Sequence, residues 1–327
     1  MFLFSIPDSG KIRILNFALF EALQNYKEWF YDDFKIDIVY GCPPSCIWNG
    51  GRVENGEKYS ERWGNDIVKF YMRHGAKYRL NFTNLLIQEN HLKDEYANSI
   101  AKVVNEIGGF ATVTLQILAS YIEKMYPNLP IVWSTSSDYG NDIDEKIKRI
   151  NFLSKKNIVV LPYELNDNIL SDVFLYPENL EILVGETCLP NCPKRKEHQI
   201  QTSKTICEGI FDESVNNCLW KIEERNNVNY SAVIARQNLL QYTKKGVNRF
   251  KISGRDFLEQ ALAAYVHYFV VEQYRDNFIS FLIETDYNMK INFGIINVTA
   301  NPSCFFNEKR YERMLYIYDK GGNVFVK

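Results

Sequence analysis

Apolar residues recur along this chain with two periods, one typical of helices and one typical of strands. Within residues 11–33, Ile12, Leu15 and Leu19 fall on one side of a predicted helix. The stretch KIDIVYGC, residues 35–42, then predicts a strand that enters a loop. This succession of a helical and an extended segment continues through most of the chain.

Further strands and helices follow in alternation, with short connections. Strands are predicted at 78–86, 129–136, 158–165, 180–188 and 247–255, and helices at 66–75, 93–108, 114–127, 142–157, 167–179 and 256–276. Alternation of this kind favours a parallel sheet or barrel. Roughly six or seven β/α units favour an α/β fold of the TIM-like (β/α) barrel type, irregular or incomplete. An open doubly wound sheet is the alternative.

The predicted barrel domain spans residues 1–276 and contains most of the cysteines. Residues 277–327 differ in character, because stretches such as KINFGIINVTANPSCFF suggest extended structure. We expect them to form a small C-terminal extension packed on the barrel. No linker rich in proline or serine separates the two parts.

Composition narrows the class of protein. The chain has 327 residues, of which 46% are hydrophobic, which suffices for a large core. The formal net charge of −2 gives no general argument for nucleic-acid binding. No apolar run approaches the ~20 residues of a membrane helix, and MFLFSIPDSGK lacks a signal-peptide pattern. We therefore expect a cytoplasmic protein without membrane contact, whose seven cysteines remain thiols.

The segment ETCLPNCPKRKEH, residues 186–198, carries two cysteines at the end of a predicted strand. Four cysteines follow one another from this point: Cys188, Cys192, Cys207 and Cys218. Two more, Cys42 and Cys46, follow another predicted strand. Because the strand ends of a barrel meet at one mouth, these thiols could converge as soft metal ligands. Their spacing matches neither a zinc ribbon nor a C-x-x-C redox pair, and simple packing is the alternative for any one of them.

Several segments resemble the peptidase U32 family. They are ETCLPNCPKRKEH, the strand GVNRFKISGR at 246–255, and NIVVLPYELND at 157–167. In addition, IDIVYGC resembles the first strand and cysteine loop of a member that helps hydroxylate ubiquinone precursors without oxygen. The resemblance spans most of residues 35–275, and GVNRFKISGR is its most specific part.

The resemblance implies a TIM-like barrel that carries a [4Fe–4S] cluster on four cysteines. Transferred to this chain, the ligands are Cys188, Cys192, Cys207 and Cys218, with Cys42 or Cys46 as an alternative fourth ligand. The cysteine spacings here are shorter than in the family, and CPKRKEH replaces its usual residues.

The activity implied is an oxygen-independent hydroxylation of a small or RNA-borne substrate. A peptidase is the second hypothesis, although the sequence has neither a G-x-S-x-G elbow nor an H-E-x-x-H helix. A non-catalytic subunit that binds a protein partner is the third hypothesis, because some family members work in pairs.

Three residues are candidates for catalysis. Glu186, beside a negatively charged cluster, would bind a proton more tightly and could act as an acid, or it could simply accept hydrogen bonds from loop amides. Lys251 alternates with Phe250 along a strand, and an inward lysine would need a partner. Arg255, at the end of that strand, could hold an anion or form a surface ion pair.

Further residues are candidates for substrate binding: Asn49, Arg52, Asn81, Arg195 and His198. In WNGGR, paired glycines allow a close approach of the backbone to a ligand, and the arginine could contact a carboxylate or phosphate in bidentate fashion. An ordinary turn with a solvated arginine is the alternative. His267, in a predicted helix among aromatic residues, is expected to serve packing.

Overall fold

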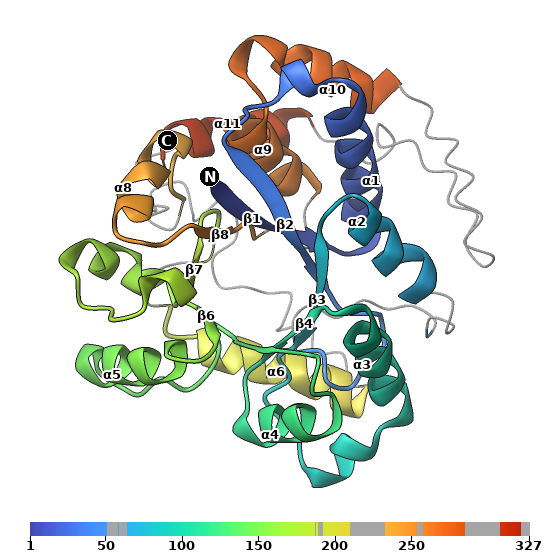
Figure 1. Ribbon diagram of the computed structural model, residues 1–327, viewed down its shortest axis with the longest axis vertical. Helices are drawn as coiled ribbons and strands as arrows, with labels where there is room; N and C mark the ends of the chain where they lie inside the picture. The colour runs from blue at the N-terminus through green and yellow to red at the C-terminus, as the bar shows by residue number, and fades with distance from the viewer. Residues whose placement is uncertain are drawn as a thin grey trace.

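Eight parallel strands close into a barrel in this computed structural model, which describes residues 1–50, 58, 64–186, 188, 192–209, 233–253, 258–284 and 308–321 (Figure 1). Each strand pairs with the next, and β8 pairs with β1. The strands are β1 (Phe2–Asp8), β2 (Phe34–Gly41), β3 (Lys77–Phe82), β4 (Phe110–Val113), β5 (Ile131–Trp133), β6 (Ile158–Val160), β7 (Leu180–Leu183) and β8 (Arg249–Lys251). The predicted TIM-like barrel is confirmed.

Helices surround the barrel and connect successive strands (Figure 1). They are α1 (Gly10–Asn25), α2 (Lys69–Arg73), α3 (Glu95–Ile107), α4 (Gln116–Met125), α5 (Ile143–Ser154), α6 (Arg195–Glu208), α8 (Leu239–Lys244), α9 (Leu258–Phe269), α10 (Arg275–Glu284) and α11 (Glu308–Asp319). A 3-10 helix, Tyr163–Ser171, follows β6. Among the described residues, no helix combines the length and apolar character that a membrane crossing requires.

The structure corrects several of the predicted elements. Strands β1 and β4 were not predicted from the sequence, and with them the barrel closes with eight strands. The sequence FLFSIPD is buried at nearly every position and therefore lacks the alternation of a half-exposed strand. The helix predicted at 256–276 ends at Phe269, and α10 begins at Arg275. In the region predicted to be extended, the described residues form the last part of α10 and all of α11, while KINFGIINVTANPSCFF lies outside the described residues.

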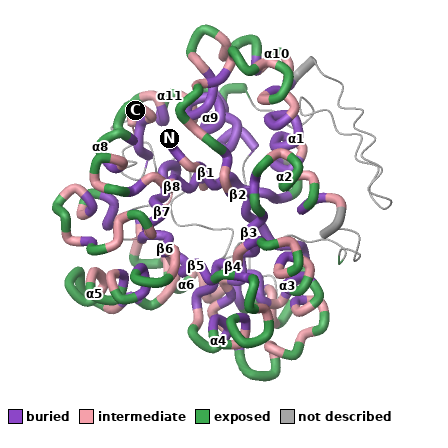
Figure 2. Tube along the Cα trace, viewed as in Figure 1, coloured by how far each residue is buried: buried purple, intermediate pink, exposed green. Residues whose placement is uncertain are grey.

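The two faces of the strands meet different surroundings. Outward side chains such as Phe4, Leu80 and Phe250 pack beneath the helices in the main apolar core. In Figure 2, buried residues accordingly follow the strands and the helix faces turned toward them. The smaller apolar cluster consists of Val132, Val160, Tyr163 and Leu183. Because side chains alternate between the two faces of a strand, Val132, Val160 and Leu183 point into the barrel. The other inward positions are left to polar residues.

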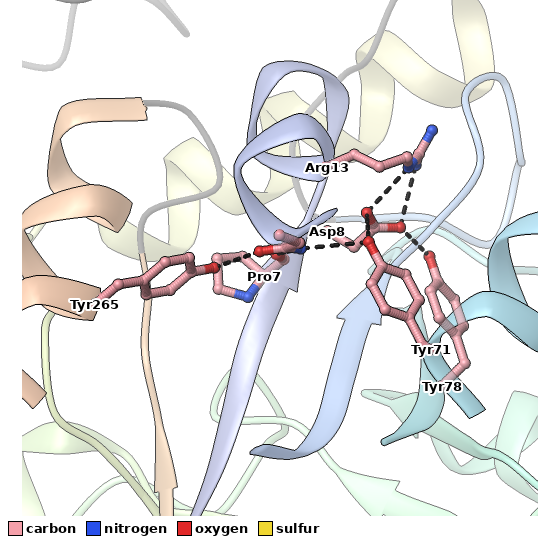
Figure 3. A network of polar contacts seen from close by, with 7 residues as sticks. Pro7, Asp8, Arg13, Tyr71, Tyr78 and Tyr265 are labelled. Carbon is pink, nitrogen blue, oxygen red and sulfur yellow. Dashed lines mark hydrogen bonds and ion pairs between the residues drawn. The ribbon is translucent and has the colours of Figure 1, made fainter. Parts of the chain in front are cut away.

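A buried carboxylate fixes α1 and α2 against the first strands (Figure 3). Asp8, at the end of β1, accepts hydrogen bonds from Arg13 Nε at 3.0 Å and Nη2 at 3.1 Å. The hydroxyls of Tyr71 and Tyr78 donate to the two oxygens of the same carboxylate at 2.8 and 2.9 Å. Gly41 is required beside this network, because a Cβ there would lie 2.3 Å from the carbonyl oxygen of Asp8.

The C-terminal helix α11 is attached to α9 through a buried histidine. Nδ1 of His267 donates to Asp319 Oδ1 at 2.7 Å, and the backbone N–H of Arg236 donates to Nε2 at 2.9 Å. Arg275 binds the same aspartate with two N–H groups at 2.9 and 3.0 Å. Because Nε2 accepts a hydrogen bond, the imidazole must be neutral. His267 therefore joins the two helices by hydrogen bonds, in addition to the packing role expected from the sequence.

This histidine predicts how stability depends on pH. Burial lowers the pKa of His267 below its ordinary value, although the bond to Asp319 opposes the shift. The unfolded state therefore takes up the proton first as pH falls below about 6.5. We expect the free energy of unfolding to be fully present above that pH and to decline toward pH 5, as measured by urea denaturation.

In His267→Gln this decline should be reduced, because glutamine does not titrate. His74→Gln, which replaces a histidine bonded to the carbonyl of Phe70, is the matched control and should decline as the wild type does. An unchanged decline in His267→Gln would contradict the assignment.

Candidate functional site at the carboxyl ends of the strands

Helix α6 crosses the mouth of the barrel at the carboxyl ends of the strands. Nε2 of Gln199 donates to Ser136 Oγ in the loop after β5, at 3.0 Å. Ser203 Oγ accepts the backbone N–H of Leu85, after β3, at 3.0 Å. The first residue of α6, Arg195, contacts the loop after β6. One helix therefore joins three loops at the carboxyl end of the barrel. This is the end at which TIM-barrel enzymes bind their substrates.

The beginning of α6 is held by a cation. The guanidinium of Arg195 pairs with Glu164 and donates to the hydroxyl of Tyr163, with its centre 4.4 Å from the tyrosine ring centroid. The Tyr163 hydroxyl in turn donates to the carbonyl of Cys188 at 3.2 Å. Burial, and then the neighbouring thiol, raise the pKa of Tyr163, so the phenol remains protonated. Arg195 is thus placed beside the cysteine segment, as its sequence position suggested.

Cys188 lies half-buried over the inner apolar cluster of the barrel. Its backbone N–H donates to Glu186 Oε1 at 2.9 Å. Burial and the charge of Glu186 raise the pKa of the Cys188 thiol, and Cys192 is near enough to contribute in the same direction. Glu186 therefore accepts a loop amide, and its role as an acid stays a prediction.

The predicted ligand set is not brought together by the described residues. Cys207 lies twelve residues after Arg195 in α6, a separation of about 18 Å at 1.5 Å per residue. Its sulfur instead accepts Nδ2 of Asn84 at 3.3 Å. Among the described residues, no group of three or more His, Cys, Asp or Glu side chains is placed to hold a metal ion. The alternatives Cys42 and Cys46 are buried in the loop after β2, and Cys218 lies outside the described residues.

Inside the barrel, a second polar group lies below the mouth. Arg79 on β3 and Glu181 on β7 form an ion pair of 2.8 Å, with side chains exposed by only 1% and 2%. These strands stand four apart in a ring of eight, so the pair crosses the interior. Ser5 Oγ donates to Glu181 Oε1 at 2.5 Å. Neither Arg79 nor Glu181 was predicted from the sequence as a site residue.

Lys251 belongs to the same interior group. It is 8% exposed, and its Nζ lies 4.1 Å from the ring centroid of Tyr40 on β2. Burial alone would raise the pKa of Glu181, but the charges of Arg79 and Lys251 hold it below its ordinary value. Lys251 therefore points inward, as its alternation with Phe250 allowed, and its catalytic role stays a prediction.

The other predicted residues are distributed around the mouth. Asn49 is buried in the loop after β2, where its backbone N–H donates to the carbonyl of Cys46 at 3.0 Å. Asn81 is buried on β3, two residues after Arg79 and on the same face. His198 lies in α6. Arg52 and Arg255 lie outside the described residues.

Comparison with known proteins gives a single kind of neighbour. No family model and no curated protein sequence matches the chain. Among solved structures, the chain is similar to one described as a U32 peptidase, with a TM-score of 0.46 and 14% identity, over 78% of this chain and 94% of that chain. A similarity of this size says nothing about activity.

The interior charges predict a stability effect. Glu181→Gln keeps the shape of the side chain but leaves Arg79 buried without the anion of its ion pair. We expect a loss of roughly 3–5 kcal/mol in the free energy of unfolding, measured in urea. Adding Arg79→Met to this variant should recover much of the loss.

Lys245→Met is the control, because it removes an ion pair with the exposed Asp172 and should cost at most about 1 kcal/mol. A Glu181→Gln protein as stable as this control would contradict the proposed importance of the pair.

Proposed function

We propose that the chain is a U32-like barrel enzyme that modifies a small or RNA-borne substrate at the mouth closed by α6. The observation that supports this is the meeting of Cys188, Arg195 and Tyr163 over the inner apolar cluster. These residues come from the loops after β6 and β7 and from α6, so the fold gathers reactive and charged groups from separate segments. Barrel enzymes place their catalytic residues at this end of the strands.

The finer part of the proposal is an oxygen-independent hydroxylation that uses an iron–sulfur cluster, as the family resemblance implies. Such a cluster takes four ligands, and when bound it would supply redox chemistry. At the mouth, the described residues offer Cys188 and Cys192, while Cys207 lies along α6 from them. The described residues alone thus do not complete a four-thiolate site, and the cluster stays a proposal.

Iron content tests this proposal. After anaerobic purification, or reconstitution with iron and sulfide, we expect about four iron atoms per chain and the visible absorption of a cluster. Cys188→Ser and Cys192→Ser should lose the iron. Cys207→Ser should retain it, because the length of α6 separates this thiol from the pair.

The position of Cys207 makes it the matched control for the other two substitutions. A colourless, iron-free wild-type protein would contradict the cluster. If Cys207→Ser loses its iron while Cys188→Ser and Cys192→Ser retain theirs, the ligand assignment is wrong.

A cysteine-peptidase mechanism finds less support. It needs a thiolate nucleophile, which is produced by a neighbouring cation or base that lowers the cysteine pKa. At Cys188, burial and the charge of Glu186 raise the thiol pKa, and the neighbouring Arg195 only partly offsets them. We therefore favour a modifying enzyme over a peptidase.

A further inference from the structure

Helix α6 meets the mouth of the barrel with a polar stripe. Four of its residues, spaced at intervals of four, share one face of the helix and contact loops at the carboxyl ends of the strands. These residues are Arg195, Gln199, Ser203 and Cys207, and their partners in the loops are Glu164, Ser136, Leu85 and Asn84. A helix that is packed permanently on a domain usually turns an apolar face toward it.

The apolar residues of α6 do not anchor the helix. Its aliphatic side chains are Ile200 and Ile206, and both are partly exposed. Among the described residues, neither belongs to an apolar cluster of the core or packs against one. Helix α3, on the outside of the barrel, instead buries Ala97, Ile100 and Val104. Because apolar burial provides most of the energy that holds a helix on its domain, α6 is attached less firmly than α3.

The contacts that do hold α6 are easily exchanged with water. When the helix moves away, the donors and acceptors of the polar stripe can bind water instead, so each bond adds little to the closed position. The beginning of the helix is also unfavourable, because Lys194, Arg195 and Lys196 bring cations to the positive end of the helix dipole. Closure therefore depends strongly on Glu164, which pairs with Arg195.

We propose that α6 is a lid that opens and closes over the mouth of the barrel, with the ion pair between Arg195 and Glu164 as its latch. The two side chains are exposed by only 25% and 16%, so water screens their attraction less than that of a surface pair. The same guanidinium contacts Tyr163, whose hydroxyl donates to the carbonyl of Cys188. Opening of the latch therefore uncovers the cysteine segment. Active-site lids are drawn from the least stable elements of a fold, and they open without unfolding of the core.

The lid controls access to the site of the proposed function and rests on that function for its purpose. The motion itself requires neither iron nor substrate. A helix of 14 residues is marginal in water on its own, so α6 loses its backbone hydrogen bonds when it leaves the barrel. Its opening can therefore be measured as exchange of its backbone amides.

Hydrogen–deuterium exchange on the full chain, read by mass spectrometry of peptides, tests the lid. We expect the amides of α6 to exchange about tenfold or more faster than those of α3. Low concentrations of urea should hardly change the rate in α6, because a local opening exposes little surface. Glu164→Gln retains the shape of the side chain but removes its charge, so exchange in α6 should rise about tenfold further while α3 is unchanged.

The thiol of Cys207 gives a second readout, because its sulfur accepts a hydrogen bond from Asn84 only while α6 is closed. Its alkylation by iodoacetamide, located by peptide mass spectrometry, should accelerate in Glu164→Gln together with the exchange. Cys46 is buried in the loop after β2 and is the internal control, whose alkylation should remain slow. Lys245→Met removes an exposed ion pair and is the matched control variant, in which both rates should equal those of the wild type.

A further variant keeps the test independent of the latch. Ser203→Ala removes the contact with Leu85 and should also raise exchange in α6. Exchange in α6 as slow as in α3, or only together with global unfolding in urea, would show a fixed wall and overturn the proposal. Unchanged exchange and alkylation in Glu164→Gln would overturn the role of the ion pair as latch. Neither readout uses activity or iron content, so failure of the proposed function and failure of the lid are distinguishable.

Discussion

The ion pair between Arg79 and Glu181 is the constraint on which the inside of this barrel depends. Two charges that are almost wholly buried must be neutralised within the barrel, because water cannot reach them. Their strands lie on opposite sides of the ring, so the pair fixes β3 and β7 at one height. A shift of one residue in either strand would turn its charge into the outer apolar core. The pair therefore specifies register as well as charge balance.

Asp8 shows the same chemistry in a completed form outside the barrel. Its two oxygens accept four hydrogen bonds, from an arginine in α1 and from tyrosines in α2 and β3 (Figure 3). Such a satisfied network positions elements and leaves no group for a ligand. Arg79 differs because only part of its hydrogen-bonding capacity is used by the described residues.

Much of the fold could be predicted from local patterns. Alternating strands and helices gave the barrel, and the position of Cys188 after an apolar strand gave the mouth. Alternation placed Lys251 and Phe250 on opposite faces of the strand, and only the closed barrel shows that the lysine is the inward one. β1 could not be recognised in this way, because a strand buried on both faces shows no alternation.

The interior ion pair and the placement of Cys207 exceed what linear spacing can reveal. Arg79 and Glu181 lie about a hundred residues apart, and each alone resembles a charged residue in an ordinary strand. Cys207 is close to Cys192 in the sequence, but it lies near the far end of α6, about 18 Å along the helix from Arg195. Local periodicity predicts helices and strands. A site forms only when the barrel closes and brings residues from distant strands together.

Strand β7 connects the interior ion pair with the mouth of the barrel. It carries Glu181 inside the barrel, continues through Leu183 in the inner apolar cluster, and leads to Glu186 and Cys188 at the mouth. α6 then lies over the opening and is held there chiefly by polar contacts, since its buried residues are Thr202, Ser203 and Thr205. A single strand thus carries the buried anion and leads directly to the cysteine at the mouth.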